Sequence, residues 1–168
     1  MIRAILCGAS GKMGGFVASA AENDSEISIV AGVDKVNSGE KFPVFSSFSD
    51  INVDADIIID FSNVALLDSM LDYALSQNIP LVIATTGYTE EQTGKIKKAS
   101  EKIPIFFTFN MSVGVNLIAA LAKKAASILG DGFDIEIIEQ HHNQKIDAPS
   151  GTAIMLANAV NSVFGDSL

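Results

Sequence analysis

Short apolar runs alternate with helical patterns along the first 130 residues of the chain. Runs with the length and composition of buried strands lie at residues 2–7, 27–33, 56–61, 80–84 and 104–109. Between them, apolar residues recur at helical spacing in residues 12–22, 64–75 and 117–128, and residues 89–102 are expected to form a polar helix. Pro43 limits residues 42–48 to a short edge strand at most. This alternation with tight loops predicts an α/β fold with a doubly wound parallel sheet.

The hydrophobic period marks the position of each helix. In the first helix the apolar positions at helical spacing include Met13 and Phe16, and in the last they include Leu117 and Leu121. Residues three and four apart share a face of a helix.

The pattern changes after residue 130. Phe133, Ile135 and Ile137 alternate with Asp134 and Glu136, which is the period of a half-exposed strand. A helical pattern follows over residues 150–164. We therefore expect a dinucleotide-binding domain at residues 1–130 and the start of an α+β substrate domain at residues 131–168. One strand cannot form a sheet, so this second domain is expected to be incomplete.

A glycine-rich loop joins the first strand to the first helix. Gly8, Gly11 and Gly14 have the spacing G-x-x-G-x-x-G. Glycines in this position allow a tight turn and the close approach of a pyrophosphate to the N-terminus of a helix. Asp34, 20 residues after Gly14, ends the second strand, where an acidic residue would hold a ribose diol. The context predicts a Rossmann domain that binds NADH or NADPH.

Lys35, beside Asp34, could meet a 2′-phosphate, but Asp34 would repel the same group, so the preference between the two cofactors stays open. Ligands of such sheets bind beyond the carboxyl ends of the strands. The residues expected to contact the cofactor are therefore Gly8, Ala9, Ser10, Gly11, Lys12, Met13, Asp34, Lys35, Ala84, Thr85, Thr86, Thr108, Phe109, Asn110 and Met111.

The richest chemistry lies in residues 139–153. The two histidines of the chain, His141 and His142, precede Lys145, and Ser150-Gly151-Thr152 begins a helix. A proton donor, a positive charge and helix-terminal N–H groups together predict a site that holds an anion and protonates it.

Two alternatives for the same segment are disfavoured. A metal site of Glu139, His141, His142 and Asp147 would have adjacent histidines that face apart and no third nitrogen or sulfur ligand, so we expect no metal. A hydrolase triad of Ser150, a histidine and Asp147 lacks a nucleophile elbow and leaves the glycine loop unexplained.

Composition narrows the partners and the compartment. The net charge is −9, which argues against nucleic acid or an anionic membrane as the main partner. The single cysteine, Cys7, lies in an apolar run and indicates a buried thiol in a reducing compartment. The chain shows no signal peptide and no uninterrupted apolar run long enough for a membrane span. We expect a cytoplasmic protein.

Residues 139–153 resemble the signature of the 4-hydroxy-tetrahydrodipicolinate reductase (dihydrodipicolinate reductase) family of the diaminopimelate route to lysine. Residues 8–14, 60–62, 85–87 and 110–116 match the same family in order and spacing. The resemblance implies NADH- or NADPH-dependent reduction of a cyclic imine dicarboxylate to tetrahydrodipicolinate. It also implies that His141 is the general acid and that Lys145 handles a second proton and pairs with a carboxylate. His142 would contact substrate, and Gly151 and Thr152 would hold a carboxylate.

The resemblance further implies a homotetramer and a longer C-terminal part. We therefore expect this chain to be incomplete and to turn over slowly. Two other functions stay open: another NAD(P)-dependent dehydrogenase of an amino-acid pathway, and an inactive dinucleotide-binding fragment.

Overall fold

The structure, a computed structural model, describes residues 1–36, 39–108, 110–141, 143 and 148–165. The chain divides into two compact units, residues 1–108 and 109–168, which are described separately. This division is geometric, and the functional boundary expected near residue 130 stays a prediction.

The first unit is built on a six-stranded sheet in the order β3-β2-β1-β4-β5-β6. Every strand pair is parallel. The strands are β1 (Ile2–Cys7), β2 (Ile27–Val33), β3 (Val44–Phe45), β4 (Ile57–Asp60), β5 (Leu81–Ile83) and β6 (Ile105–Phe107). This order is that of a dinucleotide-binding Rossmann sheet. The predicted fold class is confirmed, as is the short edge strand beside Pro43.

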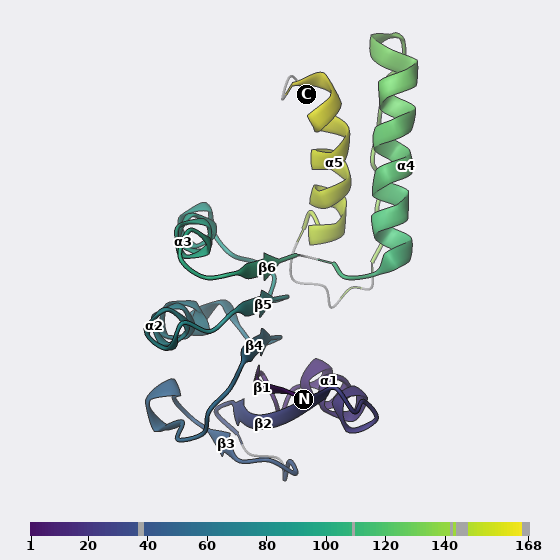
Figure 1. Cartoon of the computed structure of the whole chain (residues 1–168). Helices are drawn as coiled ribbons and strands as arrows, with labels where there is room; N and C mark the ends of the chain where they lie inside the picture. Colours follow the sequence, from purple (N-terminus) through teal and green to yellow (C-terminus); the bar gives the residue numbers. More distant parts are fainter. Residues whose placement is uncertain (37–38, 109, 142, 144–147, 166–168) are drawn as a thin grey trace. The chain divides into compact units, whose positions relative to one another are not determined.

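Helices cover both faces of this sheet (Figure 1). Helix α1 (Lys12–Glu22) lies on one face, and α2 (Leu67–Gln77) and α3 (Glu90–Ser100) lie on the other. The short 3-10 helix η1 (Phe48–Asp50) lies between β3 and β4, and η2 (Val64–Leu66) leads from β4 into α2. α3 begins with a capping box, in which Thr89 accepts from the Gln92 N–H and Gln92 accepts from the Thr89 N–H.

The core lies between the sheet and its helices. Ile5, Leu6 and Ile58 from the central strands are fully buried, as are Leu67 and Met70 of α2 to within 1%. Complete burial of such a side chain contributes about 1.5–3 kcal/mol. Strands covered on both faces carry apolar residues on both faces, which explains the continuous apolar runs of the sequence.

The second unit contains two long helices, α4 (Val113–Leu129) and α5 (Gly151–Phe164), and the short η3 (Gly130–Gly132). α4 and α5 lie side by side (Figure 1). The buried residues of the two helices are small: Ala119 and Ala126 in α4, and Ala153 and Val160 in α5. Small residues allow two helix backbones to approach closely.

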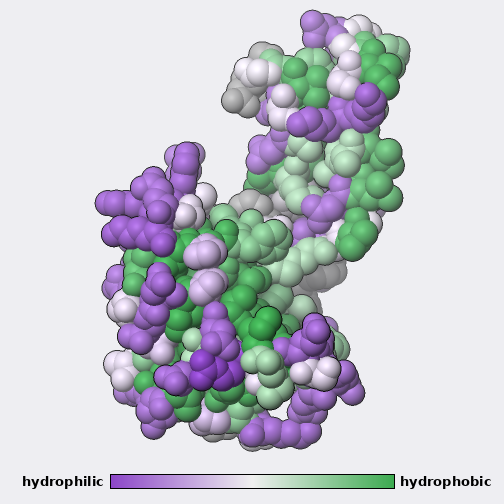
Figure 2. Space-filling view, viewed as in Figure 1, coloured by the Kyte–Doolittle hydropathy of each residue, from purple (hydrophilic) through white to green (hydrophobic). Residues whose placement is uncertain are grey.

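The helices are as predicted, and the structure adds which of their faces are buried. Met13 and Phe16 of α1 are 47% and 61% exposed, and Gly14 and Ala21 are the buried residues of that helix. On α4, Leu117 is among the exposed apolar side chains. Figure 2 shows hydrophobic surface along this helix. Periodicity locates an amphipathic helix, but its contact face depends on the shape of the neighbouring element, and here small residues fit better.

The strand expected at residues 133–142 is also not observed. Phe133 has extended dihedral angles, φ −135° and ψ 135°, yet no strand is assigned at residues 133–141. A strand requires a hydrogen-bonded neighbour, and none pairs with this segment within the described part of the chain.

The stretch Val113–Gly132 has 20 residues and a mean hydropathy of 1.4, and passes the length and composition criteria for a membrane span. Lys123 and Lys124 interrupt it near its centre, where a charged residue costs about 2.5–3.5 kcal/mol in a membrane. The two lysines argue against a spanning helix, and the expected absence of a membrane partner stays a prediction.

Candidate functional site

The loop between β1 and α1 requires glycine at two of its three regularly spaced positions. Gly8 has a φ of +76°, and a Cβ there would lie 2.5 Å from the carbonyl oxygen of Phe61. A Cβ on Gly14 would lie 2.2 Å from the carbonyl oxygen of Gly8. At Gly11 the nearest atom would be 3.2 Å away, a contact that a small shift relieves. The packing of the chain itself therefore explains Gly8 and Gly14, whereas Gly11 is better explained by the approach of a ligand.

The start of α1 has unused hydrogen-bond donors. Gly11 is its N-cap and supplies no side-chain hydrogen bond. The first N–H groups of a helix, here those of Lys12 and Met13, have no acceptor inside the helix and lie at its positive end. Both residues are exposed, while Ala9 in the preceding turn is 2% exposed. This end of α1 can hold an anionic group such as a pyrophosphate.

Asp34 lies against the same loop. Its carboxylate accepts hydrogen bonds from the Ser10 N–H at 3.0 Å and from the Lys35 N–H at 2.7 Å. The Ser10 hydroxyl donates to the carbonyl of Val36 at 2.6 Å. The structure thus brings the end of β2 and the glycine loop together, as the sequence predicted, and the Lys35 side chain is exposed beside them.

A buried carboxylate, Asp60, ends β4. It is fully buried and accepts from the N–H of Ser62 at 3.0 Å, from the Ser62 hydroxyl, and from the Tyr88 hydroxyl at 3.3 Å. The Tyr88 ring in turn packs edge-on against Phe107 of β6. Burial, and then the charge of Asp60, raise the pKa of Tyr88 well above its ordinary value, so Tyr88 is a neutral donor.

The sequence pattern did not predict this network, although one signal was present. An aspartate at the end of an otherwise apolar strand needs partners when it is buried. Asp60 also raises the pKa of Cys7, for which burial is the larger cause. The thiol is therefore inert, in agreement with the expected buried cysteine.

The ends of β5 and β6 lie at the same edge of the sheet. Ala84 donates its N–H to the carbonyl of Asp60 at 2.9 Å, and Thr108 donates to the carbonyl of Ile83 at 3.1 Å. Thr86 is exposed, but Thr85 is 6% exposed, and among the described residues its hydroxyl interacts with the Tyr88 side chain without forming a hydrogen bond of good geometry. An orphaned buried hydroxyl is costly. The edge of the sheet therefore contains a polar group that fits a ligand which can bond to it.

In the second unit, two predicted residues from distant parts of the sequence meet. The Asn110 side-chain amide donates to the Thr152 hydroxyl at 2.9 Å. The Asn110 Oδ1 accepts from the Ser112 N–H at 2.8 Å, and Asn116 donates to the Asn110 carbonyl at 3.0 Å. Met111, beside this turn, is 43% exposed. Thr152 accepts a hydrogen bond from Asn110, and no acceptor for its own hydroxyl hydrogen is found among the described residues, so this hydrogen can point to a ligand.

The start of α5 combines a cap with unused donors. Ser150 is 3% exposed, and its hydroxyl accepts from the Ala153 N–H at 3.1 Å. The N–H of Ser150 donates to Glu139 at 2.8 Å. Among the described residues, no acceptor is found for the N–H groups of Gly151 and Thr152, the first two of the helix. Groups of this kind can hold a carboxylate, and the expectation that they do so stays a prediction.

Of the residues expected to do the chemistry, His141 is described, and its Nδ1 lies 3.5 Å from Glu139. Phe109, His142 and Lys145 lie outside the described residues. In the ranges that are described, no group of three or more histidine, cysteine or acidic side chains could hold a metal ion.

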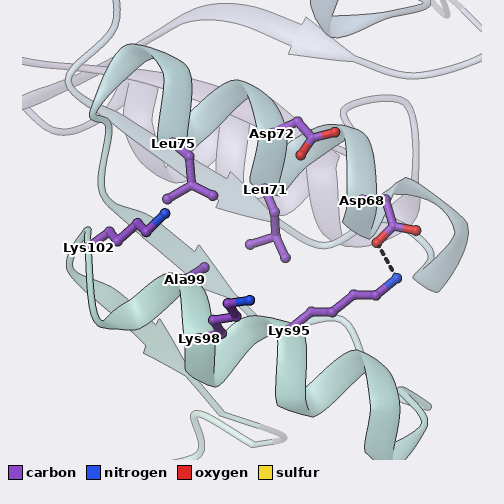
Figure 3. A pocket seen from close by; sticks show the side chains of 8 residues that line it. All are labelled: Asp68, Leu71, Asp72, Leu75, Lys95, Lys98, Ala99 and Lys102. Carbon is purple, nitrogen blue, oxygen red and sulfur yellow. Dashed lines mark hydrogen bonds and ion pairs between the residues drawn. The ribbon is translucent and has the colours of Figure 1, made fainter.

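A groove of about 310 Å³ between α2 and α3 contains none of the predicted residues (Figure 3). Its lining residues are acidic on α2, basic on or next to α3, and apolar between them: Asp68, Leu71, Asp72, Leu75, Lys95, Lys98, Ala99 and Lys102. Lys95 pairs with Asp68 at 2.8 Å across it. The groove therefore contains an ion pair of its own, and none of its lining residues lies at the ends of the strands.

Comparison with known families matches both units of the chain. A family model described as "Dihydrodipicolinate reductase, N-terminus" matches residues 2–111. A second, "Dihydrodipicolinate reductase, C-terminus", matches residues 114–166.

Curated relatives give the same result. The 4-hydroxy-tetrahydrodipicolinate reductase of Caldanaerobacter subterraneus is 48% identical over 164 residues, which cover 98% of this chain and 65% of the relative. That of Clostridium novyi is 46% identical over 161 residues, covering 95% of this chain and 64% of the relative. The chain thus spans about 65% of the length of these relatives.

Solved structures agree on the fold. A dipicolinate-bound dihydrodipicolinate reductase from Paenisporosarcina sp. TG-14 superposes with a TM-score of 0.77 at 30% identity. The match covers 97% of this chain and 66% of that one. A myo-inositol dehydrogenase from Corynebacterium glutamicum, at 19% identity and a TM-score of 0.58 over 78% of this chain and 43% of its own, shares the fold alone.

Proposed function

The chain belongs to the dihydrodipicolinate reductase family, and we propose on that premise that it serves the NAD(P)H-dependent reduction of 4-hydroxy-tetrahydrodipicolinate to tetrahydrodipicolinate. The observation that carries the proposal is the start of α5, where the Gly151 and Thr152 donors lie in the same unit as His141. This arrangement suits an anionic substrate that must be protonated.

The first unit would hold the cofactor. The N-terminus of α1 would bind the pyrophosphate, Asp34 would accept from the adenosine ribose, and the ends of β5 and β6 would face the nicotinamide. Support comes from the glycine at position 11, which the packing of the chain does not require, and from the orphaned Thr85 hydroxyl. When bound, the reduced nicotinamide would supply a hydride.

The second unit would hold the substrate. The solved Paenisporosarcina relative is bound to dipicolinate, a dicarboxylate, and the donors at the start of α5 fit one carboxylate of such a molecule. The Thr152 hydroxyl would donate to this carboxylate and at the same time accept from the Asn110 amide. Lys145 and His142 would supply a second charge and a further contact, as the family resemblance implies.

His141 would complete the reduction. The substrate loses its hydroxyl as water, a hydride adds to that ring carbon, and a proton must reach a neighbouring carbon. The imidazolium form of His141 would give this proton from a ring nitrogen and become a neutral imidazole. Hydride and proton together account for the two-electron reduction.

The remaining expectations belong to the same proposal. They are a homotetrameric assembly, a cytoplasmic location, and a functional division into residues 1–130 and 131–168. Each is supported by the family resemblance or the sequence pattern.

The cofactor is tested by calorimetric titration of the chain with NADH and NADPH. We expect both to bind, and Lys35→Ala to weaken NADPH more than NADH if the lysine meets the 2′-phosphate. Because the contact would be exposed, the difference should shrink at high salt. Equal changes for both cofactors would show that Lys35 is an ordinary surface residue.

The reaction is tested by following oxidation of the bound cofactor with enzymatically generated 4-hydroxy-tetrahydrodipicolinate. The assay uses this chain and a chimera extended with the C-terminal residues of the Caldanaerobacter relative. Oxidation that depends on this substrate supports the proposal. Oxidation driven instead by homoserine or aspartate would assign another dehydrogenase, and cofactor binding without turnover in the chimera would indicate a binding module.

A further inference from the structure

The carboxylate of Glu139 connects the start of α5 to the imidazole of His141. Oε1 accepts from the N–H of Ser150 at 2.8 Å, and Oε2 accepts from the Ser150 hydroxyl. The same Oε2 lies 3.5 Å from Nδ1 of His141. This contact brings the side chains of Glu139 and His141, which are two residues apart in the sequence, next to each other.

Glu139 is held firmly on its helix side. Ser150 is almost fully buried, and its hydroxyl both donates to Glu139 and accepts from the Ala153 N–H. The carboxylate also lies at the N-terminus of α5, where the helix dipole favours a negative charge. Two hydrogen bonds from one rigid residue fix the plane of a carboxylate better than one contact from a mobile side chain would.

The contact between Glu139 and His141 is longer than those to Ser150, but it involves one particular ring nitrogen, Nδ1. The side chains of His141 and Glu139 are 39% and 29% exposed, so the imidazole can still reach a ligand. A carboxylate beside Nδ1 favours the state in which Nδ1 carries hydrogen. The proton that an imidazolium can then give away is the one on Nε2, which faces away from Glu139.

We propose that Glu139 is a positioning residue for His141, which it orients from the start of α5 so that Nε2 is the proton-donating atom. The proposal rests on the proposed function, in which His141 is the acid. When the Nε2–H bond breaks, the proton goes to substrate, and the imidazole keeps its Nδ1–H toward Glu139 as a neutral ring. The same contact ties the acid to the helix whose first N–H groups would hold the carboxylate of the substrate.

The tautomer of His141 tests this without turnover. The chain has two histidines, so ¹⁵N-histidine labelling and long-range ¹H–¹⁵N spectra give two imidazole patterns, and His142→Gln assigns them. At a pH where both rings are neutral, we expect the Nδ1–H tautomer for His141. Glu139→Gln should replace this pattern with a mixture of tautomers. Glu136→Gln, which removes an exposed carboxylate of the same segment, should leave it unchanged.

Activity gives an independent measure in the chimera described above. Glu139→Gln should lower kcat about tenfold or more with little change in the Kd of NADH, because it misorients the acid and leaves the cofactor site intact. An unchanged His141 tautomer in Glu139→Gln, with the protein still folded by circular dichroism, would overturn the positioning role. If the tautomer responds but no substrate is reduced, the positioning contact stands and the proposed reaction fails.

Discussion

Three glycines at the start of α1, the N-cap Gly11 and the helical Gly14 and Gly15, allow one substitution to be tested in three environments. The change to alanine adds the same methyl group at Gly11, Gly14 and Gly15. At Gly14 the methyl would lie 2.2 Å from the Gly8 carbonyl oxygen and 2.5 Å from that of Ala9. An ordinary contact begins near 3.4 Å, so the backbone must move by about 1 Å at a buried position. We expect a loss of about 4 kcal/mol or more, the range of severe packing defects.

The other two positions should tolerate the methyl group. Gly15 has nothing within 4 Å of its Cβ position. Alanine inside a helix should stabilise the protein there by about 0.5–1 kcal/mol. Gly11→Ala meets one atom at 3.2 Å and replaces an N-cap glycine, which together should cost about 1 kcal/mol. For a chain of this size each kcal/mol shifts Tm by about 2–4 °C.

The order of the three variants in NADH affinity should differ from their order in stability. Gly11→Ala places its methyl group where the pyrophosphate would approach, so we expect the Kd of NADH to rise at least about tenfold, equivalent to 1.4 kcal/mol. Gly11→Val should have a larger effect. Gly15→Ala, the matched control, should bind normally. Thermal unfolding gives the stability of each variant, and calorimetric titration gives its Kd for NADH. Normal NADH affinity in folded Gly11→Ala protein would refute the claim that this glycine is reserved for a ligand.

Three further changes test other parts of the structure. Thr85→Val should stabilise the ligand-free chain by about 1–3 kcal/mol and weaken NADH binding, because it removes a buried hydroxyl that has no well-formed hydrogen bond among the described residues. Exposed Thr86→Val should do neither. A lower Tm for Thr85→Val would show that this hydroxyl is satisfied in the ligand-free chain. The side-chain hydrogen bond from Arg3 lowers the pKa of Asp56 from 3.8 to about 2, so its contribution to stability is complete above pH 3.8 and is lost as the pH falls through about 2. Asp56→Asn should therefore reduce the drop in Tm between those pH values, and an equal drop in both proteins would show that the pair is too screened by water to matter. His141→Gln should lower kcat of the chimera by about 10²-fold while cofactor affinity stays the same, and full activity would remove His141 as the acid.

Much of the first unit could be predicted from the sequence because its determinants are local. A strand buried on both faces must be apolar throughout, as in β1, and a helix must show a period near 3.6 residues. Capping residues such as Thr89 and Ser150 begin their helices where the side chain itself supplies the acceptor. Because parallel strands place their carboxyl ends at one edge, the positions of Asp34 and Thr85 followed from the order of elements alone.

The donors at the start of α5 were also predictable, since the first N–H groups of any helix lack internal acceptors. The residues that orient these donors could not be predicted from the sequence. Asn110 and Thr152 are 42 positions apart, and Glu139 and Ser150 are 11 apart. No local pattern relates such pairs, because their contact depends on how two segments pack.

The sequence by itself determined the identity and order of the elements, the glycine loop, and the residue types available for binding an anion and donating a proton. Tertiary structure decided which face of a helix is buried, since Gly14 and Ala21 rather than Met13 and Phe16 let α1 approach its neighbours. It decided that Asp60 is satisfied by Ser62 and Tyr88. It also decided that residues 133–141 form no strand among the described residues, because backbone hydrogen bonds of a sheet need a second segment. Local sequence fixes what each residue can donate or accept, and only folding fixes which partner it meets.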